Sequence, residues 1–134
     1  VQNYFEQYLG QFPAQVFDKI NENFIRCSFY ELVSRYLSSC YTFAIKQNNS
    51  VGRSDFEMTG IPGTDYYTDD RVVEFKYYHA KEADRILSLT EPLTEHVQQV
   101  KGYAEDTKKK FPNYNVRSYV VYICANKGWK CWEV

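Results

Sequence analysis

The stretch that decides the fold is RVVEFKYY, residues 71–78. Its β-branched and aromatic residues favour a β-strand, and it is the strongest strand prediction in the chain. Successive side chains of a strand point to opposite faces of a sheet. Glu74 and Lys76 are therefore expected on one face, and Val73 and Phe75 on the other.

A second strand is predicted just upstream, at RSDFEM, residues 53–58. Asp55 and Glu57 share one face of it by the same alternation. If this strand pairs with the strand of residues 71–78 as a long-looped hairpin, Asp55 and Glu74 become neighbours. Adjacent carboxylates repel each other unless a cation lies between them. Mg²⁺ suits such a position because it prefers carboxylate oxygens and keeps exchangeable waters.

The other elements are predicted from apolar periodicity and from turn residues. Residues 59–70 (TGIPGTDYYTDD) are expected to be a loop, and Thr90 or Thr94 is expected to cap a helix. Runs of strands that meet a helix before another strand predict an α/β fold, with a mixed central sheet flanked by helices. In chain order, the predicted elements are a helix at 13–40 ending near Ser38-Ser39, strands at 41–47, 53–58 and 71–78, a helical region at 80–110 broken near Glu91-Pro92, and strands at 116–125 and 129–134.

Composition limits the possible classes of protein. A chain of 134 residues fits one domain (1–134), and 44% apolar residues suffice to bury a core. The net charge of −1 excludes a basic surface over the whole domain, so any contact with phosphate must be local. Because the chain begins at Val1, we expect it to be a fragment of a longer protein.

Cysteine and histidine spacing does not predict a structural zinc site, because there is no CxxC pair and the two histidines are isolated. Free thiols in a reducing, cytoplasmic setting are favoured over disulfides. No apolar run has the length of a membrane span, so no membrane association is expected. The residues concerned are Cys27, Cys40, Cys124, Cys131, His79 and His96.

The pattern Asp55…Glu74-Phe75-Lys76 resembles the signature of the PD-(D/E)XK nuclease superfamily, which has a restriction-endonuclease-like αβββαβ core. More narrowly, GRSD (52–55) followed by VVEFK (72–76) is similar to the nuclease-like domain found behind an AAA-ATPase-like domain in many bacterial proteins. QVKGY, residues 99–103, matches the QxxxY helix motif of one branch of that superfamily.

The resemblance implies a metal site. Asp55 and Glu74, with the carbonyl of Phe75, would bind Mg²⁺ or Mn²⁺. Glu22, on the first helix, occupies the place of an additional acidic ligand in many members. A solvent-exposed helix residue is the alternative interpretation of Glu22.

The resemblance also implies an activity, namely metal-dependent hydrolysis of phosphodiester bonds in DNA, with RNA not excluded. Lys76 would assist the attacking water, and Gln99 and Tyr103 would support the site or contact the nucleic-acid backbone. The alternative for Gln99 and Tyr103 is a surface pair one helical turn apart. Glu74 and Lys76 are expected to be partly exposed.

Two features depart from the family pattern. Ser54 replaces the proline of the motif, and the segment before Glu74 is long and acidic. A loop carrying Asp65, Asp69 and Asp70 would gate the site or repel DNA. The second hypothesis is therefore a nuclease-like module that no longer cuts and that serves an ATPase domain lying before it in the same chain.

Overall fold

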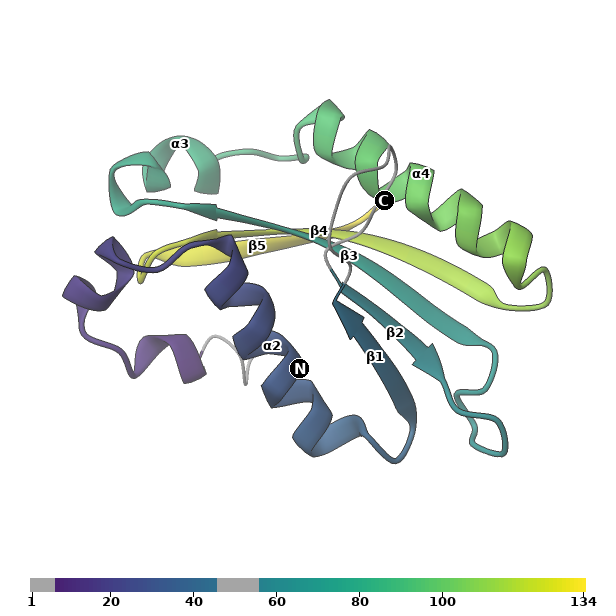
Figure 1. Cartoon of the computed structure of the whole chain (residues 1–134). Helices are drawn as coiled ribbons and strands as arrows, with labels where there is room; N and C mark the ends of the chain where they lie inside the picture. Colours follow the sequence, from purple (N-terminus) through teal and green to yellow (C-terminus); the bar gives the residue numbers. More distant parts are fainter. Residues whose placement is uncertain (1–6, 46–55) are drawn as a thin grey trace.

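The computed structural model describes residues 7–45 and 56–134. The strands are β1 (Tyr41–Ile45), β2 (Phe56–Gly60), β3 (Asp69–Tyr78), β4 (Asn115–Cys124) and β5 (Gly128–Glu133). The helices are α2 (Glu22–Leu37), α3 (Ala83–Leu87) and α4 (Thr94–Lys110), with 3₁₀ turns η1 (Ala14–Asp18) and η2 (Ala80–Glu82). The sheet lies between two helical layers, with α3 and α4 on one face and α2 on the other (Figure 1).

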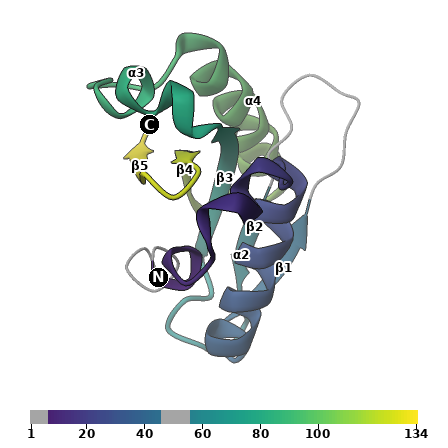
Figure 2. The same ribbon diagram turned by 90° about the vertical axis from the view of Figure 1, so that its left-hand side faces the viewer.

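The five strands form one sheet in the order β1-β2-β3-β4-β5. β3 pairs with β4 in parallel, whereas the other three neighbouring pairs are antiparallel. The predicted α/β class with a mixed sheet and flanking helices is therefore confirmed. Figure 2 shows the sheet from its side, between the two helical layers. No helix in the described part of the chain has the length and apolar composition needed to cross a bilayer.

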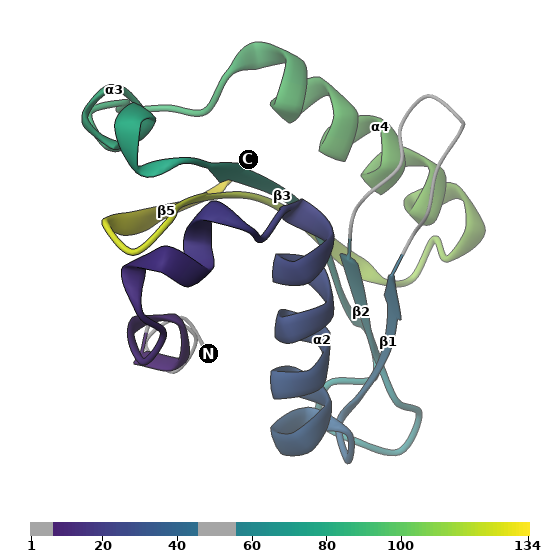
Figure 3. The same ribbon diagram turned by 60° about the vertical axis from the view of Figure 1, so that its left-hand side comes forward.

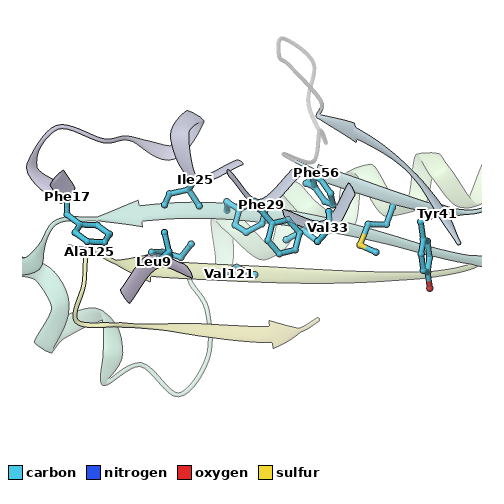
Figure 4. Close-up of a cluster of buried hydrophobic side chains, with 13 residues drawn as sticks. Leu9, Phe17, Ile25, Phe29, Val33, Tyr41, Phe56, Val121 and Ala125 are labelled. Carbon is cyan, nitrogen blue, oxygen red and sulfur yellow. The ribbon is translucent and has the colours of Figure 1, made fainter. Parts of the chain in front are cut away.

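On the α2 face, aromatic side chains form the centre of the core (Figure 4). The ring of Phe29 from α2 lies 5.0 Å from Phe56 of β2 and 5.1 Å from Phe75 of β3, measured between ring centroids. Edge-to-face and tilted contacts of this kind are the favoured arrangements of aromatic pairs. These ring contacts hold α2 against β2 and β3. Figure 3 shows α2 lying alongside the strands of the sheet.

The α4 face of the sheet has a second core. Val72, Val100 and Val120 are fully buried there, together with Tyr122. β3 therefore divides its side chains as predicted, with Val73 and Phe75 in the α2 core and Val72 in the α4 core. Because the sheet is covered on both faces, polar groups of β3 that point toward α4 are also enclosed.

The single helix predicted for residues 13–40 is wrong at its beginning. The segment forms η1 first, and α2 starts only at Glu22. Asn21 causes this break, because its side-chain oxygen accepts a hydrogen bond from the N–H of Phe24 at 3.0 Å. Such an N-cap needs extended backbone at Asn21, which interrupts helical geometry. The predicted end near Ser38 is confirmed.

The loop predicted for residues 59–70 is too long at both ends. Thr59 and Gly60 belong to β2, and Asp69 and Asp70 belong to β3. Gly60 suggested a turn, but its role is a close approach. A Cβ atom at Gly60 would lie 1.5 Å from the carbonyl oxygen of Tyr66, so the loop folds back against β2 only because glycine stands there.

The predicted cap of α4 is also wrong. Its N-cap residue is Leu93, which makes no side-chain capping bond, and Thr94 is the first helical residue. The N–H of Leu93 instead donates to the hydroxyl oxygen of Tyr122 at 2.9 Å. A tertiary contact to β4 thus replaces the local cap that the sequence suggested.

We expect Phe29→Ala to lower the free energy of unfolding by about 3–5 kcal/mol, because it removes the ring that joins α2 to β2 and β3. Urea denaturation followed by circular dichroism measures this change. Tyr36→Ala on the same helix is the matched control, since Tyr36 is 73% exposed, and it should change stability by less than ~0.5 kcal/mol. Equal losses in both variants would contradict the assigned core.

Candidate active site

The central pair of the candidate site is Glu74 and Lys76 on the α4 face of β3. Their side chains alternate with the core residues Val73 and Phe75, as the sequence predicts. The Lys76 Nζ lies 3.1 Å from the Glu74 Oε1, and the two side chains are 20% and 2% exposed, respectively. The expectation that both are partly exposed is therefore wrong for Glu74, which α4 and the sheet enclose.

A buried carboxylate is costly unless a charge or hydrogen bonds compensate it. The Lys76 ammonium supplies that compensation for Glu74 from two positions along the same strand. Its stem is long enough to place the charge beside Glu74 while its head stays in contact with solvent. Both members of the ion pair therefore belong to β3.

A second pair of acidic side chains, Glu57 and Asp70, lies beside the first. Glu57 of β2 is opposite Val72 of β3, so it is a diagonal neighbour of both Asp70 and Glu74. Asp70 is fully buried and accepts a hydrogen bond from the hydroxyl of Thr59 at 3.3 Å. Burial, and then the negative charge of Glu57, raise the pKa of Asp70 to about 8. The raised pKa favours the protonated form of Asp70 near neutral pH.

Tyr103 of α4 completes this second cluster. Its hydroxyl donates a hydrogen bond to the Glu57 carboxylate. Burial raises the pKa of Tyr103, and the hydrogen bond to Glu57 adds to the rise, so the phenol stays protonated as a donor. The tyrosine of the QxxxY motif is therefore connected to the acidic pair Glu57 and Asp70 and is not an isolated surface residue.

The other predicted site residues are placed as follows. Gln99 is half-buried on α4, one turn before Tyr103. Glu22 is half-buried in the first turn of α2 and lines a hollow with Tyr77 and His79. These positions leave their proposed roles as predictions.

Two metal-ligand predictions concern Asp55 and Phe75. Asp55 lies outside the described residues. The Phe75 side chain belongs to the α2 core, so its proposed contribution is its main-chain carbonyl only. In residues 7–45 and 56–134, no three His, Cys, Asp or Glu side chains are grouped so as to hold a metal ion. The carboxylate of Glu74 is nevertheless the hard oxygen donor that Mg²⁺ and Mn²⁺ prefer.

Sequence reasoning undervalued Asp70, which was expected in a gating loop. Asp69 and Asp70 are instead strand residues on opposite faces, and Asp69 binds Arg71 and Arg117. Once the strand is extended to Asp69, its alternation places Asp70, Val72 and Glu74 on one face, and this pattern could have identified Asp70 as a neighbour of the site. Asp65 alone of the three acidic residues lies in the loop.

The fold and the ExK pair on the central strand define a restriction-endonuclease-like α/β domain. The family model of the PD-(D/E)XK nuclease superfamily matches residues 20–133. The chain belongs to the PD-(D/E)XK nuclease superfamily. No curated protein and no solved structure matches the chain.

The pKa of Asp70 gives a prediction for stability against pH. A carboxyl group whose pKa is about 8 when folded, against ~3.9 when unfolded, binds its proton more tightly in the native state. The free energy of unfolding should therefore fall as the pH rises through this window. Asp70→Asn cannot ionise, so we expect a flatter profile and a Tm at high pH above that of the wild type by about 3–8 °C.

Thermal melts across that pH range, with a chelator present, measure the effect. Asp65→Asn is the control, because Asp65 is exposed and should keep the wild-type slope. Identical slopes in the wild type and in Asp70→Asn would show that Asp70 is not held protonated.

Proposed function

We propose that this chain is a Mg²⁺- or Mn²⁺-dependent nuclease that hydrolyses phosphodiester bonds in DNA. The observation that carries the proposal is the enclosed Glu74 carboxylate, with the Lys76 ammonium 3.1 Å away, on the central strand of a superfamily member. In a surface ion pair both side chains would be exposed, and the pair would contribute little to stability. In this pair the Glu74 carboxylate is instead enclosed under α4, and a glutamate is almost never so buried unless it is paired.

The metal would be held by Asp55, Glu74 and the Phe75 carbonyl, with Glu22 as a further candidate ligand. The donor set fits Mg²⁺ and Mn²⁺, because it consists of carboxylate and carbonyl oxygens. When bound, such an ion supplies Lewis-acid polarisation of the phosphate. The assignment of Asp55 rests on the sequence motif.

Lys76 would act on the phosphate and on the attacking water. Its ammonium is held by Glu74 at 3.1 Å, so it would offer a fixed positive charge to the negative charge that develops during hydrolysis. Because the charge is already in position, little reorganisation is needed at the moment of reaction. Lysine suits this task as a compact point charge with three donor hydrogens.

Gln99 and Tyr103 would support the site from α4. The bond from Tyr103 to Glu57 favours a supporting role for this tyrosine over a direct contact to the DNA backbone. Lys108, Lys109 and Lys110 at the exposed end of α4 are candidates for phosphate contacts, which would make binding salt-sensitive. Association with an ATPase-like domain and a cytoplasmic location remain predictions from the sequence.

The test combines calorimetric titration of Mn²⁺ with a nicking assay on supercoiled plasmid DNA. The wild type should bind Mn²⁺ and nick the plasmid only when the metal is present. Glu74→Gln should lose at least tenfold in Mn²⁺ affinity, because it loses a charged oxygen ligand. Lys76→Met should bind Mn²⁺ but cut at least ~100-fold more slowly.

Asp84→Asn is the control, since Asp84 is exposed on α3 and its substitution should leave both measurements unchanged. Lys76→Met leaves the buried Glu74 charge without its ammonium, so its Tm should be lower and should rise more on addition of Mn²⁺ than that of the wild type. A folded wild type that neither binds Mn²⁺ nor nicks DNA would overturn the proposal and favour the module that does not cut.

A further inference from the structure

The proposed catalytic lysine has two neighbours that the family motif does not include. Lys76 of β3 and Tyr122 of β4 are direct partners in the parallel ladder, so their side chains stand side by side on the α4 face. Tyr122 is the largest fully buried side chain in the described residues. Its ring packs against Tyr78, His96 and Trp132 at centroid distances of 5.3, 5.4 and 5.2 Å.

The hydroxyl of Tyr122 makes two hydrogen bonds to the beginning of α4. It accepts from the N–H of Leu93 at 2.9 Å, and it lies 2.5 Å from the Nδ1 of His96. His96 is itself buried and lies in the first turn of α4, two residues after Thr94. The pair therefore fixes the N-terminal turn of α4 directly beside Lys76.

The charge state of His96 follows from its surroundings. Burial lowers the pKa of His96, and the positive charge of Lys76 lowers it further, while Glu95 acts in the opposite direction. Burial also raises the pKa of Tyr122, so the phenol keeps its hydrogen. A neutral imidazole and a protonated phenol at 2.5 Å can share one hydrogen bond, in which the phenol donates to Nδ1.

We propose that Tyr122 and His96 are positioning residues for Lys76, with Tyr122 donating to the Nδ1 of His96 and His96 kept neutral with its hydrogen on Nε2. The inference rests on the proposed function in so far as Lys76 is the catalytic lysine. The neutral pair borders one side of the lysine without adding a charge that would compete with the ion pair between Lys76 and Glu74. The Tyr122 ring limits the positions that the lysine stem can take.

Protonation of His96 would undo this arrangement in two ways. A second cation would face Lys76 of β3, and Nδ1 would no longer accept from Tyr122 of β4. On its own helix, Glu95 is the charged group near the ring, with its Oε1 3.7 Å from the Nε2 of His96. Because Glu95 is largely exposed, solvent screens its compensating charge. The activity that depends on Lys76 should therefore fall as the pH drops through the pKa of His96.

The first arm of the experiment is nitrogen NMR of the histidine rings and needs no nucleic acid. The chain has only two histidines, so His79→Asn assigns the signals of His96. At pH 7, His96 should show the Nε2–H tautomer and should titrate below the ordinary histidine value of about 6.5. In Lys76→Met, which lacks the neighbouring cation, this titration should move to higher pH.

The second arm measures plasmid cleavage against pH. His96→Ala removes the Nδ1 acceptor and should lower kcat about tenfold or more with KM within about twofold, because only the position of Lys76 changes. His96→Asn restores an acceptor near the Nδ1 position that cannot be charged. It should recover most of that loss, and its activity relative to the wild type should rise by about tenfold per pH unit below the pKa of His96. His79→Asn, at an exposed position, is the matched control and should follow the wild-type profile.

An Nδ1–H tautomer, a charged His96 at pH 7, or a titration unaffected by Lys76→Met would overturn the proposal. So would a His96→Asn profile that superimposes on that of the wild type. If the wild type cuts no DNA, the proposed nuclease function fails, and the NMR arm still decides whether Tyr122, His96 and Lys76 are coupled.

Discussion

The buried ion pair between Glu74 and Lys76 is the constraint on which the rest of the site depends. A carboxylate that is 2% exposed on the central strand of a covered sheet must have its charge compensated locally. The compensating ammonium comes from the same strand, two residues on. Both charges of the pair therefore come from one strand, and α4 must close over β3 without displacing the lysine. The packing of α4 therefore determines whether Lys76 stays beside Glu74.

The charge of the neighbouring carboxyl groups, Glu57 and Asp70, is compensated in a different way. Glu57 and Asp70 lie diagonally across β2 and β3, where a second lysine is not supplied by either strand. A proton on Asp70 reduces the negative charge, and the hydroxyls of Thr59 and Tyr103 donate hydrogen bonds to Asp70 and Glu57, respectively. One face of β3 thus holds a carboxylate balanced by an ammonium next to a carboxyl pair balanced by a proton.

Helix α4 is tied to the sheet at both ends of this acidic row. Near its beginning, Leu93 and His96 bond to the hydroxyl of Tyr122, and two turns further on Tyr103 bonds to Glu57. Between these ties, Val100 is fully buried against the sheet. The hydrogen bonds fix the helix along its axis, and apolar packing fixes its distance from the sheet. These contacts hold the part of α4 that carries Gln99.

The sequence by itself determined which residues of β3 lie on each face of the sheet and to which superfamily the chain belongs. Strand alternation separated Glu74 and Lys76 from Val73 and Phe75, and the ExK and QxxxY spacings pointed to the PD-(D/E)XK nuclease superfamily, because each of these patterns is local and spans five consecutive residues or fewer. The tertiary structure alone decided what surrounds them. The contacts of Glu57 with Tyr103 and of His96 with Tyr122 join residues 46 and 26 positions apart. Such contacts depend on strand register and on the position of α4 on the sheet within the β3–β4 crossover. Neither is determined by the local sequence pattern. The ends of β2 and β3 were missed for the same reason, because Gly60 and Asp70 look like turn residues until their partners across the sheet are known.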